Sequence, residues 1–388
     1  MSVHRWKVEN DTLGYLDGDD FIVPDAMDIC NLIFQNQGNL ADKPINDLKI
    51  EKLFKRESRI FCDRGLVLDV KEAQGNFEIL CLPSIRKKDG SILVLPRGYE
   101  HDHIISGNVW MPIREKSLPL PAGISFLEEG NDNHQITLRN YLDLITNQDH
   151  FSFVDNRISY HLNAENLGNR GVYMRPEGFN ADMHLRPYQQ KGFSWLNMLA
   201  EQGLGCILAD EMALGKTVQL IALICHRKYL KKGKTLVVCP VTLIENWRRE
   251  VLKFSEGISV AIHYGANRSR NFKTYNNDDV VITNYESVIN DLPALRMISW
   301  DMVILDEAHA IKNPDTERSK AVKKLHRNLG IALTGTPMEN RIDDIWSIMD
   351  FANPGFLDDI SAFRELYENT EEDAARLEPI IAPLKLRR

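Results

Sequence analysis

The sequence lacks the features of membrane-spanning, secreted and zinc-binding proteins. It has no run of about 18 apolar residues, and its N-terminal stretch, MSVHRWKVENDTLGYLDGDD, has no apolar signal core. The six cysteines are scattered without a Cys-x-x-Cys pair, which predicts free thiols in a reducing compartment and no zinc site. These absences predict a cytoplasmic protein, nucleoid-associated if bacterial, with no membrane contact.

Size and charge limit the remaining classes. A chain of 388 residues is long enough for two or three domains, because single cores rarely outgrow about 250 to 300 residues. The formal net charge of -8 argues against a protein that coats nucleic acid without preference. It still permits a local basic track on an acidic body.

Residues 1–180 carry mixed signals that favour a smaller α+β accessory domain. Short β-prone runs alternate with turn residues, and Lys88-Asp89-Gly90 between two apolar runs predicts a hairpin turn. Residues 136–145 have apolar residues at helical spacing. His101 and His103 flank Asp102, but other ligands at matching spacing are missing, so a solvated loop is expected there and not a metal site.

Residues 181–388 show a different pattern, which predicts an α/β domain. Longer amphipathic segments separate six buried-strand runs: GCILAD, TLVVCP, VAIHY, VVITN, MVILDE and LGIALTG. Strands that are apolar almost throughout indicate a parallel sheet with helices on both faces. Ligands of such sheets bind at the carboxyl ends of the strands.

The stretch LADEMALGKTVQ lies at one of these strand ends, before a predicted helix. A strand-to-helix turn points backbone N–H groups and the positive helix end at an anion. Lys216 would add a positive charge at the β and γ phosphates of a nucleotide, and Thr217 a hydroxyl ligand for Mg²⁺. The tripeptide Gly-Lys-Thr is common, but its position here favours a nucleotide site.

Two further strand ends carry polar groups. Asp306 and Glu307 follow the run MVIL, where one carboxylate can hold Mg²⁺ and the other can take a proton from water. Alone, the pair would more simply be acids at a helix N-terminus. The segment Thr334-Gly335-Thr336 is either an ordinary turn or a relay that senses the γ phosphate through His309.

Six ordered stretches together resemble one family. They are LRPYQQKGFSWL, ILADEMALGKTVQ, LVVCPVTLIENWRREVLKF, VVITNYESV, VILDEAHAIKN and LTGTPMENRIDDIWSIMDFANPGFL, between about Leu185 and Arg388. In this order they resemble the first motor lobe of the Swi/Snf-type (sucrose-nonfermenting) double-stranded-DNA translocases of helicase superfamily two, most closely the bacterial branch. The resemblance implies a RecA-like fold and leaves residues 1–180 unexplained.

The resemblance also implies roles for residues at matching positions. Gln189, with Arg186 nearby, would read the adenine of ATP, and Thr217 and Asp306 would bind Mg²⁺. Lys216, Asp306 and Glu307 would be catalytic. The nucleotide-binding loop would comprise Asp210, Glu211, Met212, Ala213, Leu214, Gly215, Lys216 and Thr217.

DNA contacts are implied for two further segments. Residues 240–247 and the trio Thr283, Asn284 and Tyr285 would touch the DNA backbone, where contacts position the protein without reading sequence. For Trp247 and Tyr285, packing in the core is an equal alternative. The basic run at residues 226–234 is expected to be a solvated helix end and loop.

Two departures from the family pattern stand out. Ala213 replaces the usual glycine, and a left-handed backbone there would cost on the order of 1 kcal/mol, weakening ATP binding without abolishing it. The second lobe, with its glutamine and arginine motif, is missing, and no glutamine follows Gln219. We expect a truncated chain, the alternative being a partner chain that brings the missing lobe. Alone, the chain is expected to hydrolyse ATP poorly, since an arginine from the other lobe is worth roughly a thousandfold or more in rate.

The leading hypothesis is a DNA-dependent ATPase that moves on or remodels double-stranded DNA, with this chain as the N-terminal half of its motor. The alternative is a non-hydrolysing nucleotide- or DNA-binding scaffold whose residues 1–180 recruit a protein partner. A third interpretation is an RNA-unwinding enzyme with an Asp-Glu-Ala-His box. It is weaker, because such enzymes generally lack the surroundings LRPYQ and ENRIDDIWSIMDF.

Overall fold

Strands and helices fall into two units in this computed structural model. It describes residues 5–30, 62–73, 76–87, 89–96, 99, 101–107, 109–114, 135–148, 151–156, 162–170, 173–211, 213–275, 277–335 and 342–388. One unit comprises Met1–Lys71, Glu78–Ile136 and Asp143–Arg157, and the other comprises Glu72–Phe77, Thr137–Leu142 and Ile158–Arg388. Over the described ranges, no helix is both long and apolar enough to cross a membrane.

Among the described residues, the smaller unit contains two sheets, the short helix α1 and the C-terminal part of helix α2, whose N-terminal part belongs to the larger unit. The first sheet has the order β1-β2-β3, and the second has the order β6-β5-β4-β8-β7, with β9 paired to β5 and β10 paired to β4. The elements are β1 (Arg5–Glu9), β2 (Thr12–Asp17), β3 (Asp20–Ile22), α1 (Ala26–Cys30), β4 (Cys62–Ala73), β5 (Asn76–Arg86), β6 (Ile92–Val94), β7 (His103–Ser106), β8 (Val109–Arg114), β9 (Gln135–Ile136), α2 (Leu138–Thr146) and β10 (Val154–Asn156).

Two expectations for this region are confirmed and one is wrong. The predicted hairpin joins β5 to β6 with Arg86 opposite Ile92, although Lys88 lies outside the described residues. The predicted helix is α2. The solvated loop around His103 is wrong, because this residue begins β7 and is fully buried, 3.0 Å from the Asp102 carboxylate.

In the larger unit, helices cover a parallel sheet of order β13-β14-β12-β15-β16-β11-β17. The strands are β11 (Cys206–Leu208), β12 (Lys234–Val238), β13 (Val260–His263), β14 (Val280–Thr283), β15 (Trp300–Leu305), β16 (Arg327–Leu333) and β17 (Lys385–Leu386). Each of the six predicted runs forms a strand, and every residue of β14 and β15 is buried. The predicted α/β fold is confirmed, because such strands require cover on both faces.

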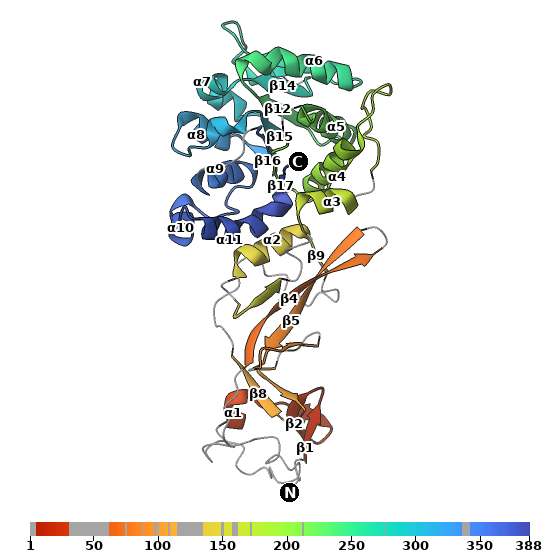
Figure 1. Ribbon diagram of the computed structural model, residues 1–388, viewed down its shortest axis with the longest axis vertical. Helices are drawn as coiled ribbons and strands as arrows, with labels where there is room; N and C mark the ends of the chain where they lie inside the picture. Colours follow the sequence, from red (N-terminus) through yellow and green to blue (C-terminus); the bar gives the residue numbers. More distant parts are fainter. Residues whose placement is uncertain are drawn as a thin grey trace. The chain divides into compact units, whose positions relative to one another are not determined.

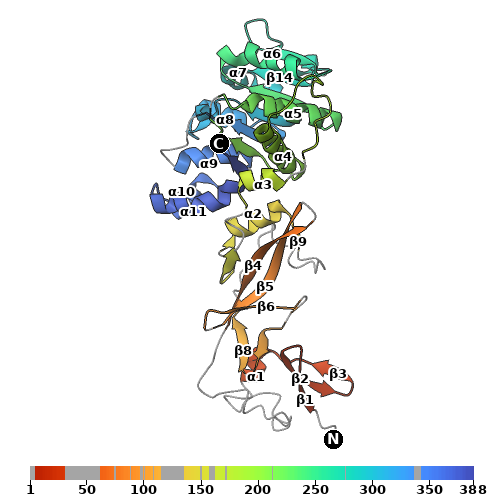
Figure 2. The same cartoon turned by 45° about the vertical axis from the view of Figure 1, so that its right-hand side comes forward.

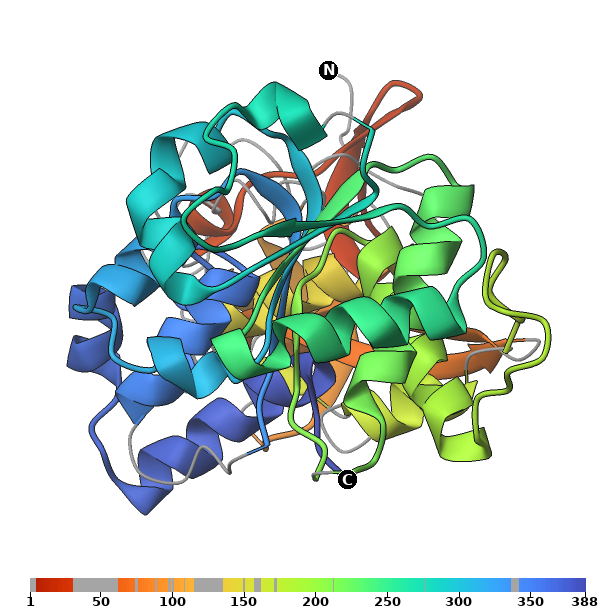
Figure 3. The same cartoon turned by 90° about the horizontal axis from the view of Figure 1, so that it is seen from above.

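Two layers of helices provide this cover. Helices α4, α5 and α6 lie on one side of the sheet and α7, α8 and α9 on the other (Figure 1, Figure 2 and Figure 3). The helices are α3 (Ala164–Arg170), α4 (Pro187–Glu201), α5 (Lys216–Tyr229), α6 (Ile244–Phe254), α7 (Tyr285–Leu295), α8 (Glu317–Lys323), α9 (Ile342–Ala352), α10 (Ile360–Leu366) and α11 (Glu371–Ile381).

Helix α3 belongs to the larger unit, although residues up to 180 were assigned from the sequence to the N-terminal domain. It packs closely on α4, since a Cβ at Gly168 would lie 2.6 Å from the backbone oxygen of Lys191. Helix α3 therefore packs with the sheet domain, and a domain division at residue 180 stays a prediction.

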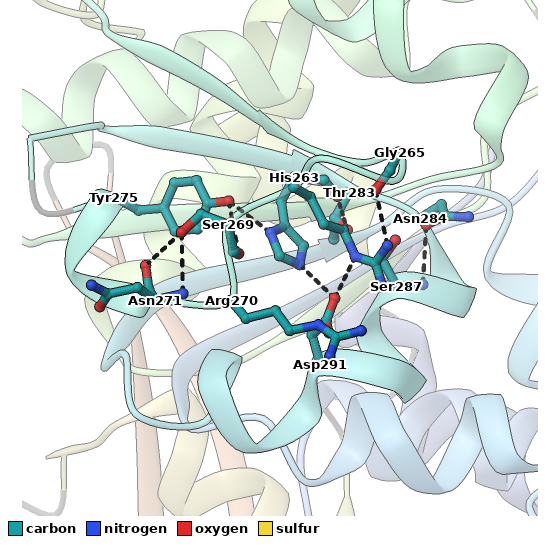
Figure 4. A network of polar contacts seen from close by, with 11 residues as sticks. His263, Gly265, Ser269, Arg270, Asn271, Tyr275, Thr283, Asn284, Ser287 and Asp291 are labelled. Carbon is teal, nitrogen blue, oxygen red and sulfur yellow. Dashed lines mark hydrogen bonds and ion pairs between the residues drawn. The ribbon is translucent and has the colours of Figure 1, made fainter.

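A buried polar network fastens the loop that follows β13 (Figure 4). The Asp291 carboxylate accepts a hydrogen bond from Arg268 Nε at 2.5 Å, lies 3.1 Å from His263 Nε2 and pairs with Arg270 Nε at 3.4 Å. His263 Nδ1 lies 2.7 Å from the Tyr275 hydroxyl. Burial lowers the pKa of His263, and the hydrogen bond to Asp291 opposes this shift. The network holds the two ends of residues 263–275 against α7.

Candidate nucleotide site

The register of the sheet brings three polar strand ends to one edge. Leu208 of β11 pairs with Leu333 of β16, and Ala332 of β16 pairs with Leu305 of β15. The phosphate-loop candidate after β11, Thr334 after β16 and Asp306 after β15 therefore follow neighbouring strands. The carboxyl edge of a parallel sheet is where ligands of this fold class bind.

The backbone of the candidate loop takes a left-handed conformation at two positions. Gly215 has φ 73°, and helix α5 begins at Lys216. A Cβ at Gly215 would lie 2.4 Å from Gln189 Nε2, so glycine is required there by space as well as by angle. Ala213 has φ 67°, which confirms the left-handed angle considered from the sequence. Met212 lies outside the described residues.

Replacing Ala213 with glycine is expected to strengthen binding of a nucleoside triphosphate by up to about fivefold. The methyl group costs on the order of 1 kcal/mol at a left-handed angle, and the greater freedom of an unbound glycine loop offsets part of the gain. Titration of a fluorescent ATP analogue measures the change. Ala375→Gly, on an exposed position of α11, is the control, and weaker binding by Ala213→Gly would contradict the expectation.

Lys216 points its ammonium into the loop. Its Nζ donates to the backbone oxygens of Asp210 at 2.7 Å and Glu211 at 3.1 Å. Burial raises the pKa of Asp306, and the positive charge of Lys216 opposes this shift.

Gln189 supports the loop from helix α4. Its Oε1 accepts a hydrogen bond from the Arg186 backbone N–H at 2.9 Å, and its Nε2 donates to the Leu214 backbone oxygen at 3.2 Å. Gln189 is buried and Arg186 is exposed. The glutamine therefore ties the loop to the start of α4, and the adenine contact of both residues stays a prediction.

Three side chains not assigned to the nucleotide site from the sequence shape its surroundings. Trp247 Nε1 donates to the Asp306 carboxylate at 2.7 Å, and the Tyr285 hydroxyl donates to the Asp306 backbone oxygen at 2.8 Å. Both rings are buried, in agreement with the core-packing alternative. Arg388 pairs with the buried Asp210. Trp247 and Tyr285 could be noticed in the sequence as aromatic residues within the family motifs. Nothing in the sequence pattern indicated Arg388.

Asp306 has a raised pKa. Burial of the carboxyl is the largest cause, and hydrogen bonds from Trp247 and from the Glu307 backbone oppose it, while the charge of Glu307 adds to it. A buried carboxylate with few neutralising partners is typical of a cation or catalytic site.

The raised pKa of Asp306 predicts a pH-dependent effect of Asp306→Asn. Because folding raises this pKa, the stability contributed by protonation is present below the unfolded pKa and is lost as pH rises through the folded pKa. The free energy of unfolding of Asp306→Asn relative to the wild type should therefore rise as the pH increases above the ordinary carboxyl pKa of 3.8. Urea unfolding at several pH values measures it. A difference that does not change with pH would contradict it.

Glu307 and His309 form a pair beside Asp306. Glu307 has φ 52°, a left-handed angle that starts the short helix η8 (Ala308–Ile311). Its Oε2 lies 3.1 Å from His309 Nδ1. Thr334 is buried and its backbone N–H donates to Leu208, whereas Thr336 lies outside the described residues. The contact of His309 is with Glu307, and its link to Thr334–Thr336 stays a prediction.

The donor set suits magnesium bound together with phosphate. The described ranges contain no group of three or more His, Cys, Asp or Glu side chains that could hold a metal alone. Mg²⁺ is usually held by one or two carboxylates, water and substrate phosphates, and not by a cage of protein ligands. The half-buried Thr217 hydroxyl and the Asp306 carboxylate match this pattern.

The side chains predicted to contact DNA are engaged within the domain. Thr283 Oγ1 donates to the His263 backbone oxygen at 2.8 Å, and Asn284 caps α7 by accepting from the Ser287 backbone at 3.1 Å. Both are buried. Within residues 240–247, Val241 is exposed. DNA contact by these segments stays a prediction. Their backbone N–H groups and exposed residues would have to make the contacts with the DNA phosphates.

The basic run at residues 226–234 differs in part from expectation. Lys231 and Lys232 are exposed, as a solvated loop requires. Arg227 is instead buried and donates to both oxygens of Asp301, at 2.5 and 2.6 Å. The solvated interpretation is wrong for this residue, because it lies on the face of α5 turned to the sheet.

Comparisons with known proteins agree with this geometry. YwqA of Bacillus subtilis (strain 168) is 42% identical over 215 residues, which are 53% of this chain and 23% of that protein. The ISWI chromatin-remodeling complex ATPase ISW2 of Saccharomyces cerevisiae is 36% identical over 217 residues, 53% of this chain and 19% of that protein. The match thus spans about a fifth of the length of these curated relatives.

A solved structure shows the same fold. The Sulfolobus solfataricus SWI2/SNF2 ATPase core in complex with dsDNA has 38% sequence identity and a TM-score of 0.52, and the alignment covers 56% of this chain and 46% of that one. The SNF2-related domain family matches residues 188–388, more than half of the chain and all of the strand ends described above. The chain therefore belongs to the SNF2-related domain family.

Proposed function

We propose that this chain is the N-terminal half of an ATP-driven motor that moves along double-stranded DNA. One observation carries the proposal: Lys216 follows β11, and Asp306 and Glu307 follow β15, at one edge of the sheet where both strands pair with β16. The loop before Lys216 has two left-handed residues. Membership of the SNF2-related family and the DNA complex of the Sulfolobus relative support it.

The residues of the site have distinct roles in this proposal. Backbone N–H groups at the start of α5 and the Lys216 ammonium bind the phosphates, and Thr217 and Asp306 hold magnesium. Bound Mg·ATP supplies the phosphoryl group, with its charge partly neutralised by the metal. Glu307 accepts the proton of the attacking water, and His309 orients the Glu307 carboxylate. Gln189 and Arg186 hold the loop and contact the adenine.

Movement on DNA requires partners for this lobe. A second motor lobe supplies arginines that stabilise the transition-state charge. Residues 240–247 and 283–285 contact the phosphates of the duplex, and residues 1–180 bind a protein partner. ATP binding closes the two lobes over the duplex, and hydrolysis lets them open and advance along the DNA backbone. The proposal does not include separation of the DNA strands.

The test is ATP hydrolysis by a protein extended through a second lobe. Duplex DNA should stimulate the rate strongly and single-stranded RNA should not. Stimulation by RNA alone would favour the RNA-unwinding alternative. Binding of ATP without hydrolysis in the presence of either nucleic acid would favour a scaffold and overturn the proposal.

A further inference from the structure

Residues 385–388 run along the first half of the phosphate loop. Strand β17 pairs in parallel with β11, with Lys385 opposite Ile207 and Leu386 opposite Leu208. Beyond the strands, the Ala209 backbone N–H donates to the Leu386 oxygen at 2.7 Å, and the Glu211 N–H donates to the Arg388 oxygen at 3.0 Å. The backbone on both sides of Asp210 is thus held by this segment.

The Arg388 side chain adds a second, charged connection. Its guanidinium pairs with the Asp210 carboxylate through Nε at 3.1 Å and Nη2 at 2.5 Å. The Asp210 side chain is 0% exposed and that of Arg388 is 17% exposed, so water screens the pair weakly. Bidentate geometry fixes the direction as well as the distance of the carboxylate.

The same guanidinium reaches both helices beside the loop. Nη2 donates to Gln219 Oε1 of α5 at 3.0 Å, and Nη1 donates to the Tyr188 backbone oxygen of α4. Helix α4 approaches this group closely on one side, because a Cβ at Gly192 would lie 3.0 Å from Arg388 Nη2. Arg388 thus joins the loop, α4 and α5 at one point.

Asp210 passes this restraint to the phosphate-binding lysine. Its side chain is held by Arg388, and its backbone oxygen accepts the hydrogen bond from Lys216 Nζ at 2.7 Å. A shift of residues 385–388 would therefore move the acceptor that positions the Lys216 ammonium.

We propose that Arg388 is a positioning residue of the nucleotide site, which couples the segment of residues 385–388 to the phosphate loop through Asp210. The inference rests on the proposed ATP binding. Withdrawal of Arg388 releases Asp210, and the loop then binds the triphosphate less tightly. By reciprocity, binding of the triphosphate tightens the contacts of residues 385–388.

The test compares Arg388→Gln with Arg387→Gln in the full chain. Arg387 is the exposed neighbour in the same segment and serves as the matched control. Titration with a fluorescent, non-hydrolysable ATP analogue should show a dissociation constant raised about tenfold for Arg388→Gln and unchanged for Arg387→Gln. Arg388→Lys should recover little, because an ammonium cannot form the bidentate pair.

A double-variant cycle and hydrogen exchange separate positioning from a merely structural role. Asp210→Asn combined with Arg388→Gln should lose no more affinity than the worse single variant, since one pair is removed in each case. In the wild type, the analogue should slow hydrogen exchange at the Glu211 amide, which bonds to Arg388. This second readout stands even if the variants fold poorly.

The outcomes are distinct. A wild-type chain that fails to bind the analogue overturns the proposed function. The coupling is overturned if the wild type binds the analogue and a folded Arg388→Gln variant binds it with the same affinity. It is also overturned if the analogue does not change the rate of hydrogen exchange at the Glu211 amide.

Discussion

Glu307→Gln should lower DNA-stimulated ATP hydrolysis by about 10² to 10⁴-fold in a protein that carries both motor lobes. The amide keeps the shape of the side chain and cannot accept the proton of the attacking water. Glu307 is placed for this role by its left-handed backbone at the end of β15 and by its contact with His309. A steady-state assay with saturating duplex DNA measures the loss.

Nucleotide binding separates this loss from general damage. The dissociation constant of an ATP analogue should stay within about twofold of the wild type, because Glu307 acts on water and not on the phosphates. Glu372→Gln, at an exposed position in the first turn of α11, is the matched control and should retain full activity. A Glu307→Gln protein that hydrolyses at the wild-type rate would remove Glu307 from the mechanism.

The sheet of the larger unit could be predicted because its strands are apolar almost throughout. Runs such as MVILDE and VVITN indicate buried strands of a parallel sheet with helices on both faces. The polar residues that follow the apolar ones mark the carboxyl edge of that sheet. The positions of Lys216 and Asp306 followed from local pattern alone. The left-handed angle at Ala213 was instead considered because the family that the sequence resembles usually has glycine at this position.

Contacts between distant residues could not be predicted in this way. Arg388 and Asp210 are 178 positions apart, and Trp247 and Asp306 are 59 apart, so nothing in either local pattern names the partner. The predicted exposure of Arg227 was wrong for a related reason. Its basic neighbours indicated a solvated helix end, and only the position of Asp301 at the start of β15 makes its burial favourable.

The smaller unit was harder because, apart from β4 and β5, its strands have six residues or fewer, and several carry polar residues. His103 lies between residues that resemble a loop, yet its ring is buried and its Nε2 accepts a hydrogen bond from the Leu13 backbone at 3.4 Å. That contact depends on the packing of β2 against β7, two strands far apart in the chain. The spacing of apolar residues along the sequence carries no information about this contact.

Asp301→Ala should lower the free energy of unfolding of the sheet domain by about 3 to 5 kcal/mol. Its carboxylate is buried and takes two hydrogen bonds from Arg227, which is also buried, so the variant leaves a desolvated guanidinium without its partner. Denaturant unfolding, followed by the fluorescence of the buried Trp300 in β15, measures the loss.

Two comparisons identify the cause of this destabilisation. Glu286→Ala breaks an ion pair with Arg318 whose side chains are 50% and 56% exposed, and it should cost no more than about 1 kcal/mol. The double replacement Arg227→Met with Asp301→Leu should recover most of the stability lost in Asp301→Ala, because no buried charge is left unpaired. If the double variant is as unstable as the single one, packing at this position and not the unpaired charge determines the loss.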